Sequence, residues 1–452
     1  METAFRKTQN IASRIFNSRY YLPAMLALAI FGVVFDAAFL CLCIYLLLCE
    51  FMLIFCDDLM SIFAPVIFTL ETAVQYYKDL TVLAQYMWYA IVPVSLALIF
   101  NIIYYRRPFT KGRYTYSYLA VSLALIFGGI GVIPAHEYFE PMGLYYTLAL
   151  GIGQFILYML FRSRITNSRD YDRIERVAET LYAAGLVFVI VIFGIYIENF
   201  AKFIEKGGVL FIKSRNYMTS VLLMSLPMTC ILVKRSDLYL IGGALMYAAM
   251  LLSGSRSGLL FGTVLLVLCA VYIYITNKKS RRLYNWLFGI AAVAGCVLAA
   301  VYLPKLYGAR FDGGKVGDKT RVEFIKRGIA NFFAHPVFGI GVANTKDLSI
   351  FKAFIPGCIT FYHNIVIQIM SSTGLVGIAA FAWQFILRAG DLLKNRKNRA
   401  FVFALSYLGI LMMSFTNPGI FCPFPETGLL TLIFTVVENN TLDERNNMEE
   451  EK

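Results

Sequence analysis

Apolar runs, mostly of about 16 to 25 residues, alternate along the chain with short polar or basic stretches. A helix rises 1.5 Å per residue, so about 20 apolar residues cross the roughly 30 Å hydrocarbon layer of a bilayer. Eleven runs beyond residue 80 therefore predict transmembrane helices. They cover residues 86–105, 114–133, 142–161, 177–197, 218–233, 238–253, 257–276, 285–303, 363–387, 400–416 and 426–437.

The first apolar region, residues 22–75, is interrupted by Asp36 and by the sequence CDD at 56–58. It fits either one long span followed by an interfacial helix or three shorter spans. We favour three spans, because an unpaired carboxylate at the bilayer centre is costly. The chain then has 14 spans, or 12 in the other interpretation, and both counts leave the two termini on the same side.

Composition supports a polytopic membrane protein. The 452 residues are 59% hydrophobic and 15% charged, whereas soluble domains have roughly 45–50% apolar and about 25% charged residues. Residues 1–19 are polar and basic, so we expect no cleavable signal peptide. Nine cysteines occur without a CxxC pair or a histidine cluster at metal spacing, so we predict no metal and no cofactor.

The net charge of +13 is explained by topology rather than by nucleic acid. With the N-terminus inside, the predicted inner segments hold 26 of the 41 lysines and arginines, as the positive-inside rule requires. We therefore expect both termini in the cytoplasm and no nucleic-acid partner. The other 15 basic residues fall on the predicted outer side, nine of them in the long loop 304–362.

Two features of the outer side suggest chemistry. Arg256 lies in the short polar sequence GSRSG between two spans, where a guanidinium either reaches lipid headgroups or binds a phosphate. In the long loop, apolar residues at helical spacing predict an amphipathic helix from Arg321 to Ala334, which His335 and Pro336 end. The following GIGVAN, 339–344, predicts a tight turn, and without a βαβ unit it is not a dinucleotide fingerprint.

His363 stands at the outer mouth of a predicted span, and its neighbour Asn364 is placed to fix the imidazole ring by a hydrogen bond. Imidazole suits proton transfer because its ordinary pKa of about 6.5 lies near neutral pH. The alternative interpretation is a histidine that caps the helix or faces headgroups. Gly374 and Gly377 would let a neighbouring helix approach closely and hold the span rigid. His136, in the outer sequence PAHEYFEP, is a weaker alternative base.

Taken together, these motifs resemble the O-antigen ligase and polymerase superfamily of bacterial envelope glycosyltransferases. The similarity rests on HPVFGIGVAN at 335–344, on HN at 363–364 followed after nine residues by GLVG, on GSRSG, and on an arginine that opens the loop helix, Arg321. The structural part of the motif comprises His335, Pro336, Gly339, Gly341, Gly374 and Gly377. The family's tryptophan after that arginine is absent, and Phe324 and Ile325 stand in its place, which puts a stacking role there in doubt.

The resemblance implies transfer of a glycan from undecaprenyl pyrophosphate to an acceptor hydroxyl of a glycan, a lipid core or a protein, on the outer face of the bacterial cytoplasmic (inner) membrane. In this scheme His363 is the general base and Asn364 orients it. Arg256, Arg321 and Arg215 bind the pyrophosphate, because fixed cations must meet the charge that develops on the leaving group. No metal is then required, and a single displacement inverts the anomeric carbon.

The expected fold is an all-α polytopic membrane protein, GT-C-like, with 12 to 14 transmembrane helices and one large extracytoplasmic loop that contains short helices. Its parts are an N-terminal bundle (1–303), the loop (304–362), C-terminal helices (363–437) and a cytoplasmic tail (438–452). We favour a surface-polysaccharide polymerase over an O-antigen ligase acting on a lipid core or another acceptor. A polysaccharide transporter or flippase, or an envelope assembly scaffold, is the alternative from another class. We see no internal repeat typical of transporters.

Overall fold

Every regular secondary-structure element in the described part of the chain is a helix. The computed structural model describes residues 2–75, 80–131, 133–139, 141–165, 172–201, 210, 212, 215–278, 281, 284–285, 289, 314–342, 361–396, 399–417 and 424–450. No strand occurs within these ranges, which confirms the all-α class. The predicted span 285–303 and most of the loop 304–362 lie outside the described residues.

The first third of the chain contains the helices that follow the early apolar runs. Their bounds are α1 Glu2–Phe16, α2 Tyr21–Val34, α3 Ala38–Phe55, α4 Phe63–Gln75, α5 Leu80–Tyr105 and α6 Thr115–Gly131. Residues 22–75 form three helices, and the first break lies at Asp36, whose φ of 50° is left-handed. The second break follows Cys56, where Asp58 accepts a hydrogen bond from the backbone N–H of Met60 at 2.8 Å.

The remaining helices carry the middle and the end of the chain. They are α7 Pro141–Leu148, α8 Gln154–Arg164, α9 Arg173–Glu198, α11 Arg215–Ser225, α12 Thr229–Leu232, α13 Tyr239–Leu252, α14 Arg256–Thr276, α16 Gly314–Ala334, α18 Ile365–Lys394, α19 Val402–Ser414 and α20 Phe424–Glu450. A π-helical turn, Ala149–Gly153, joins α7 to α8. Pro227 interrupts the predicted span 218–233 with a 3₁₀ turn.

Four described helices are long and apolar enough to cross a membrane, namely Ala38–Phe55, Arg173–Glu198, Arg256–Thr276 and Ile365–Lys394. Shorter apolar helices accompany them, including Tyr21–Val34, Thr115–Gly128 and Tyr239–Leu252. Large apolar side chains remain exposed on the outside of the bundle, as on α14, where only 28% of the apolar window is buried. Such a surface suits contact with lipid.

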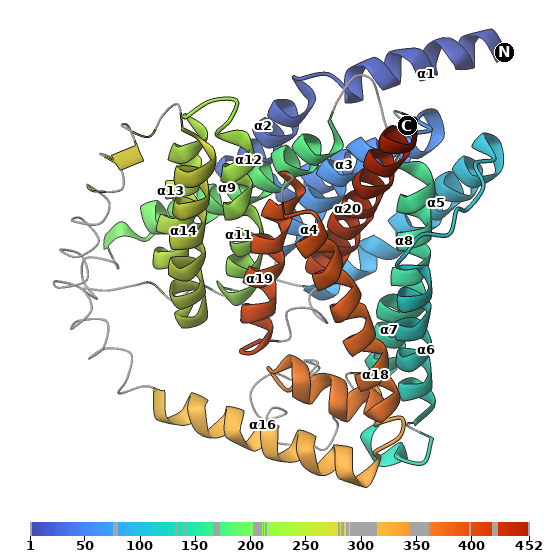
Figure 1. Cartoon of the computed structure of the whole chain (residues 1–452), viewed down its shortest axis with the longest axis vertical. Helices are drawn as coiled ribbons and strands as arrows, with labels where there is room; N and C mark the ends of the chain where they lie inside the picture. Colours follow the sequence, from blue (N-terminus) through green and yellow to red (C-terminus); the bar gives the residue numbers. More distant parts are fainter. Residues whose placement is uncertain are drawn as a thin grey trace.

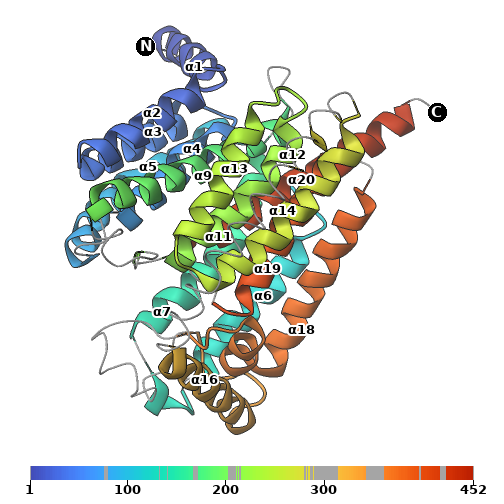
Figure 2. The ribbon, with the colours of Figure 1, turned by 90° about the vertical axis from the view of Figure 1, so that its left-hand side faces the viewer.

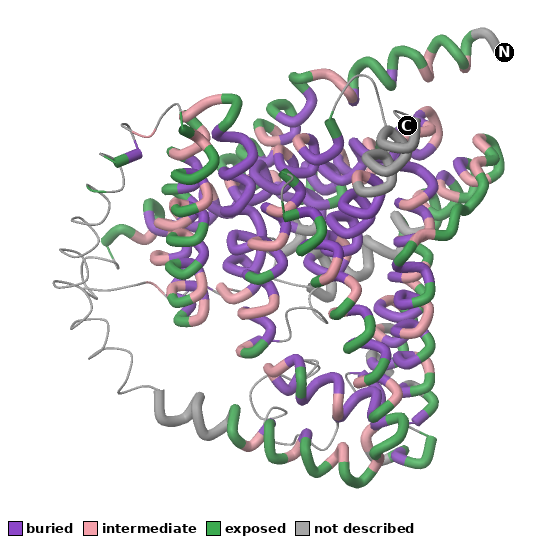
Figure 3. The backbone as a smooth tube through the Cα atoms, viewed as in Figure 1, coloured by how far each residue is buried: buried purple, intermediate pink, exposed green. Residues whose placement is uncertain are grey.

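The helices pack into one bundle with a long helix across one end. Figures 1 and 2 both show α16 lying across the end of the bundle, beside the beginning of α18. The two chain ends lie at the opposite end (Figure 1). Buried residues concentrate where α9, α11 and α19 meet (Figure 3). A separate small cluster of Phe324, Tyr362 and Ile367 joins α16 to α18.

Candidate active site beneath helix α16

His363 lies in a strained backbone conformation directly before α18. Its φ is 54°, in the left-handed region that few residues other than glycine adopt. The next residue, Asn364, is the N-cap of α18: its side chain accepts hydrogen bonds from the backbone N–H groups of Val366 at 3.0 Å and Ile367 at 3.2 Å. The strain is thus held by a cap immediately after it. Local strain of this kind is concentrated at functional sites.

The imidazole of His363 stacks on Phe324 of α16, with ring centroids 5.9 Å apart and planes 21° from parallel. Phe324 is 1% exposed. It stands three residues after Arg321, so an aromatic contact occurs where the sequence put a stacking role in doubt. Phenylalanine at this place therefore lies nearly parallel to the histidine ring.

The charge state of His363 is set by its surroundings. Burial first, and then the positive charge of Arg321, lower the pKa of His363 to about 4, while a hydrogen bond with the side chain of Asn417 opposes the shift. The ring is therefore neutral at pH 7. Its Nδ1 atom is buried and has no hydrogen-bond partner within the described ranges. A neutral ring with an unpartnered nitrogen can accept a proton from a bound hydroxyl group.

A chain of polar side chains connects His363 to the GSRSG sequence. Asn417 contacts the histidine ring, and its Oδ1 accepts a hydrogen bond from Asn216 Nδ2 at 2.9 Å. Asn216 Oδ1 accepts one from Ser255 Oγ at 2.9 Å. Ser255 Oγ also caps α14 by accepting from the Gly258 N–H at 3.1 Å. The chain brings together the beginnings of α11 and α14, the end of α19 and the segment before α18.

Two of the predicted arginines adjoin this polar chain in the sequence. Arg215 precedes Asn216 at the first residue of α11, and Arg256 follows Ser255 at the first residue of α14. Arg256 and Arg321 are exposed and Arg215 is half-buried. Arg215 and Arg256 are thus sequence neighbours of residues in the polar chain, and the charge of Arg321 acts on His363 itself.

Tyr362 fixes the approach of α16 to α18. Its hydroxyl group accepts hydrogen bonds from Asn331 Nδ2 at 2.7 Å and from Ser371 Oγ at 2.8 Å. Its backbone N–H donates to Gln368 Oε1 at 2.9 Å. The side chain is 1% exposed. The residue directly before His363 is therefore bonded to both helices that enclose the ring.

The glycine motifs form a clasp below the site. α18 breaks at Gly374, whose φ of 60° and ψ of −156° are not helical. The segment after α16 fills the break: the N–H of Ile340 donates to the Ser371 carbonyl at 2.9 Å, and the N–H of Leu375 donates to the Pro336 carbonyl at 2.8 Å. A Cβ atom on Gly374 would lie 2.4 Å from the Val337 carbonyl oxygen, so only glycine fits.

Helix α6 supplies a third close contact to this clasp. A Cβ atom on Gly128 would lie 2.5 Å from the Ser372 carbonyl oxygen, and one on Gly131 would lie 2.5 Å from the Gly339 carbonyl oxygen. The sequence FGGIG at 127–131 was the available signal, and our sequence analysis did not use it. Three backbones thus meet below His363 with little side chain between them.

The side chain of Asn364 caps α18 and donates to the Phe415 carbonyl at 3.3 Å. Asn417, which the sequence did not point to, contacts the imidazole ring. The orienting role of Asn364 stays a prediction. The neighbour that approaches Gly374 is the extended segment after α16 rather than a helix, and Gly377 faces the side chain of Thr373. His335 and Pro336 end α16 at Ala334, as predicted, and the His335 ring packs edge-on to Tyr138 at 6.2 Å.

The described residues define a helical protein of the membrane-spanning type, in which a buried histidine stacks on a helix at one end of the bundle. Residues 241–382 match the family model described as O-antigen ligase. The matched segment contains Arg256, Arg321, His363 and the glycine clasp, whereas Arg215, Asn216 and Asn417 lie outside it. No curated protein and no solved structure shows significant similarity to the chain.

The match supports the resemblance drawn from the sequence, because residues 241–382 are similar to the O-antigen ligase family.

Proposed function

We propose that this protein transfers a glycan from undecaprenyl pyrophosphate to an acceptor hydroxyl group on the extracytoplasmic face of the bacterial inner membrane. The observation that carries the proposal is His363, whose Nδ1 has no hydrogen-bond partner among the described residues, whose ring stacks on Phe324 and whose pKa is lowered in part by the charge of Arg321. All three residues belong to the segment that matches the O-antigen ligase model. We favour a surface-polysaccharide polymerase, which differs from a ligase in its acceptor and not in its chemistry.

In the proposed step, His363 takes the proton of the acceptor hydroxyl group. The acceptor oxygen forms a bond to the anomeric carbon, and the bond between that carbon and the pyrophosphate oxygen breaks with its electron pair on the leaving group. One displacement of this kind inverts the anomeric centre. The base needs a ring that is neutral before the reaction, and the lowered pKa of His363 provides it at pH 7.

A pKa of about 4 makes the free histidine a weak base, and the donor itself corrects this. Part of the lowering comes from the positive charge of Arg321. A pyrophosphate bound by Arg321 brings negative charge close to the ring, which favours the imidazolium form and raises the pKa of His363. The base would thus become stronger when the donor is in place, which restricts proton transfer to the loaded site.

Arg256, Arg321 and Arg215 are the proposed pyrophosphate ligands. A guanidinium binds two phosphate oxygens at once and keeps its charge at any physiological pH. Such fixed cations meet the charge that develops on the leaving group and make a metal unnecessary in this mechanism. Asn417, Asn216 and Ser255 are the proposed positioning residues, because their hydrogen bonds connect the beginnings of α11 and α14 to the residue that contacts the histidine.

The test is a transfer assay with purified full-length protein and a lipid-linked repeat unit. A polymerase produces a ladder of glycan lengths from the repeat unit alone, whereas a ligase produces one shifted product only when a separate acceptor is added. The same reaction in EDTA tests the absence of a metal requirement, and the anomeric configuration of the product tests inversion. Absence of any transfer with both acceptors would contradict the proposal and favour the transporter alternative.

A further inference from the structure

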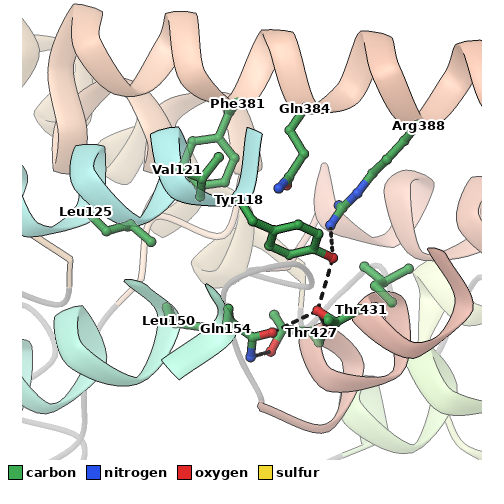
Figure 4. A pocket seen from close by; sticks show the side chains of 11 residues that line it. Tyr118, Val121, Leu125, Leu150, Gln154, Phe381, Gln384, Arg388, Thr427 and Thr431 are labelled. Carbon is green, nitrogen blue, oxygen red and sulfur yellow. Dashed lines mark hydrogen bonds between the residues drawn. The ribbon is translucent and has the colours of Figure 1, made fainter. Parts of the chain in front are cut away.

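A small cavity lies within the bundle between α6, α8, α18 and α20. Its polar lining consists of Tyr118, Gln154, Gln384, Arg388, Thr427 and Thr431, and apolar side chains complete the wall (Figure 4). The space open to water inside it is about 40 Å³, enough for about two or three water molecules. The cavity has no role in the chemistry proposed for His363, because His363 lies just before the first residue of α18 whereas Arg388 lies near its end.

Arg388 is a buried cation inside a helix long and apolar enough to cross a membrane, and it is 3% exposed. One terminal nitrogen donates a hydrogen bond to the Tyr118 hydroxyl group at 2.9 Å. The guanidinium also lies over the rings of Phe434 at 4.7 Å and Tyr118 at 5.4 Å. Its Nε atom has no hydrogen-bond partner among the described residues. Aromatic faces stabilise a guanidinium, but they do not neutralise it.

Two carboxylates near Arg388, those of Asp391 and Glu438, have other partners, and Glu426, directly before Thr427, forms no ion pair with Arg388. Asp391 pairs with Arg113. Glu438 accepts hydrogen bonds from the Tyr158 hydroxyl group at 2.8 Å and from the backbone N–H of Arg113. Within the described part of the chain, no carboxylate forms an ion pair with Arg388. A buried charge without a counter-ion is strongly unfavourable. The guanidinium of Arg388 would therefore be stabilised by an anion.

Gln384 adds a second unpartnered donor on the same face of α18, one turn before Arg388. It is 3% exposed, and its Nε2 has no hydrogen-bond partner in the described ranges. The other polar groups of the wall bond to one another: Tyr118 donates to Thr431 at 3.2 Å, Thr431 to Gln154 at 2.9 Å, and Gln154 to Thr427 at 3.1 Å (Figure 4). Two buried donors, one of them charged, are therefore left at the cavity.

We propose that this cavity binds a small inorganic anion of the size of chloride, held between Arg388 Nε and Gln384 Nε2. The ligand must be an anion because an uncompensated guanidinium faces the cavity beside a second donor. It must be small because a space for two or three water molecules accommodates a halide with one water, whereas a phosphate or a lipid headgroup is too large. The anion neutralises the positive charge of Arg388 at the place where α18 packs on α6 and α20.

Thermal unfolding of the purified full-length protein tests the site without any activity measurement. Sodium chloride is replaced stepwise by sodium gluconate at constant ionic strength, so that general screening does not change and gluconate is too large for the cavity. The midpoint of unfolding should rise with chloride concentration and reach a plateau, and bromide should substitute for chloride. An equal midpoint in both salts would overturn the proposal.

Variants at Gln384 and Arg388 locate the effect. Gln384→Glu supplies an internal carboxylate beside Arg388, so this variant should be at least as stable in gluconate as the wild type is in chloride, and its midpoint should not respond to chloride. Arg388→Gln should also lose the response. Arg281→Gln, which removes a partly exposed arginine that packs on Tyr274, is the matched control and should keep it.

The Gln384 variants test the proposed anion site even if Arg388→Gln does not fold. Gln384→Leu keeps the guanidinium and removes one donor, so it should require several-fold more chloride to reach half of the stabilisation. A wild-type response in Gln384→Glu, Gln384→Leu or a folded Arg388→Gln would place the chloride effect elsewhere and refute the site. Because no readout is glycan transfer, failure here leaves the proposed function untouched.

Discussion

Replacing Gly374 by alanine should destabilise the protein far more than the same change elsewhere in α18. The φ of 60° and ψ of −156° at Gly374 lie in a region that is nearly restricted to glycine, which costs a residue with a Cβ about 1–3 kcal/mol. The added Cβ would lie 2.4 Å from the Val337 carbonyl oxygen. That backbone must move, because no flexible side chain gives way.

Displacement of the Val337 backbone would break two backbone hydrogen bonds. The N–H of Leu375 donates to the Pro336 carbonyl at 2.8 Å, and the N–H of Val376 donates to the Val337 carbonyl at 3.3 Å. Each hydrogen bond contributes about 0.5–1.5 kcal/mol net. With the backbone strain, the expected loss in the free energy of unfolding is about 2–6 kcal/mol.

Gly390→Ala is the matched control in the same helix. A Cβ atom there meets nothing within 4 Å, so alanine should be neutral or stabilise by up to about 1 kcal/mol through its helix propensity. The assay compares the unfolding midpoints of both variants in one detergent. Equal midpoints for Gly374→Ala and Gly390→Ala would refute the clasp between α18 and the segment after α16.

Three further predictions concern the histidine pocket. Asn364→Ala should lower the free energy of unfolding by about 1 kcal/mol through loss of the α18 cap, whereas Asn364→Asp keeps the cap; equal midpoints would exclude the capping role. The protein should lose stability as pH falls from about 6.5 to about 4, because the unfolded chain takes up a proton that His363 in the folded chain does not; His363→Ala should lose this part of the pH dependence, and an unchanged profile would contradict the lowered pKa. Phe324→Leu removes a ring contact that contributes about 0.5–1.5 kcal/mol and should slow glycan transfer, which Phe324→Trp should restore; a wild-type rate for the leucine variant would show that the stack is dispensable.

Local sequence patterns predicted the helices and the motifs that lie on them. The end of α16 at Ala334 follows from the proline two residues later, and the break at Asp36 follows from a charge inside an apolar run. The histidine at the mouth of α18 was found from its position before an apolar run. In each case the physical cause lies within a few residues of its effect.

Contacts between distant segments were not predictable in this way. Asn216 and Asn417 are 201 residues apart in sequence yet 2.9 Å apart in space, and neither carries a motif of its own. Asn364 has the same side chain as Asn417 and directly follows the histidine in sequence. Proximity in sequence therefore pointed to Asn364, whereas Asn417 contacts the ring. The charge of Arg388 was counted as part of a basic inner segment, because only the packing of α6, α18 and α20 shows that it is buried.

The most direct test of the catalytic assignment is the rate of glycan transfer from a polyprenyl-pyrophosphate-linked donor by His363→Ala, at a temperature where the variant and the wild type are equally folded. Loss of a general base should reduce the rate by about 10²- to 10⁴-fold. The His335→Ala variant should transfer at close to the wild-type rate, because that ring packs on Tyr138 and takes no part in the proposed chemistry. Transfer by His363→Ala at the wild-type rate would contradict the account.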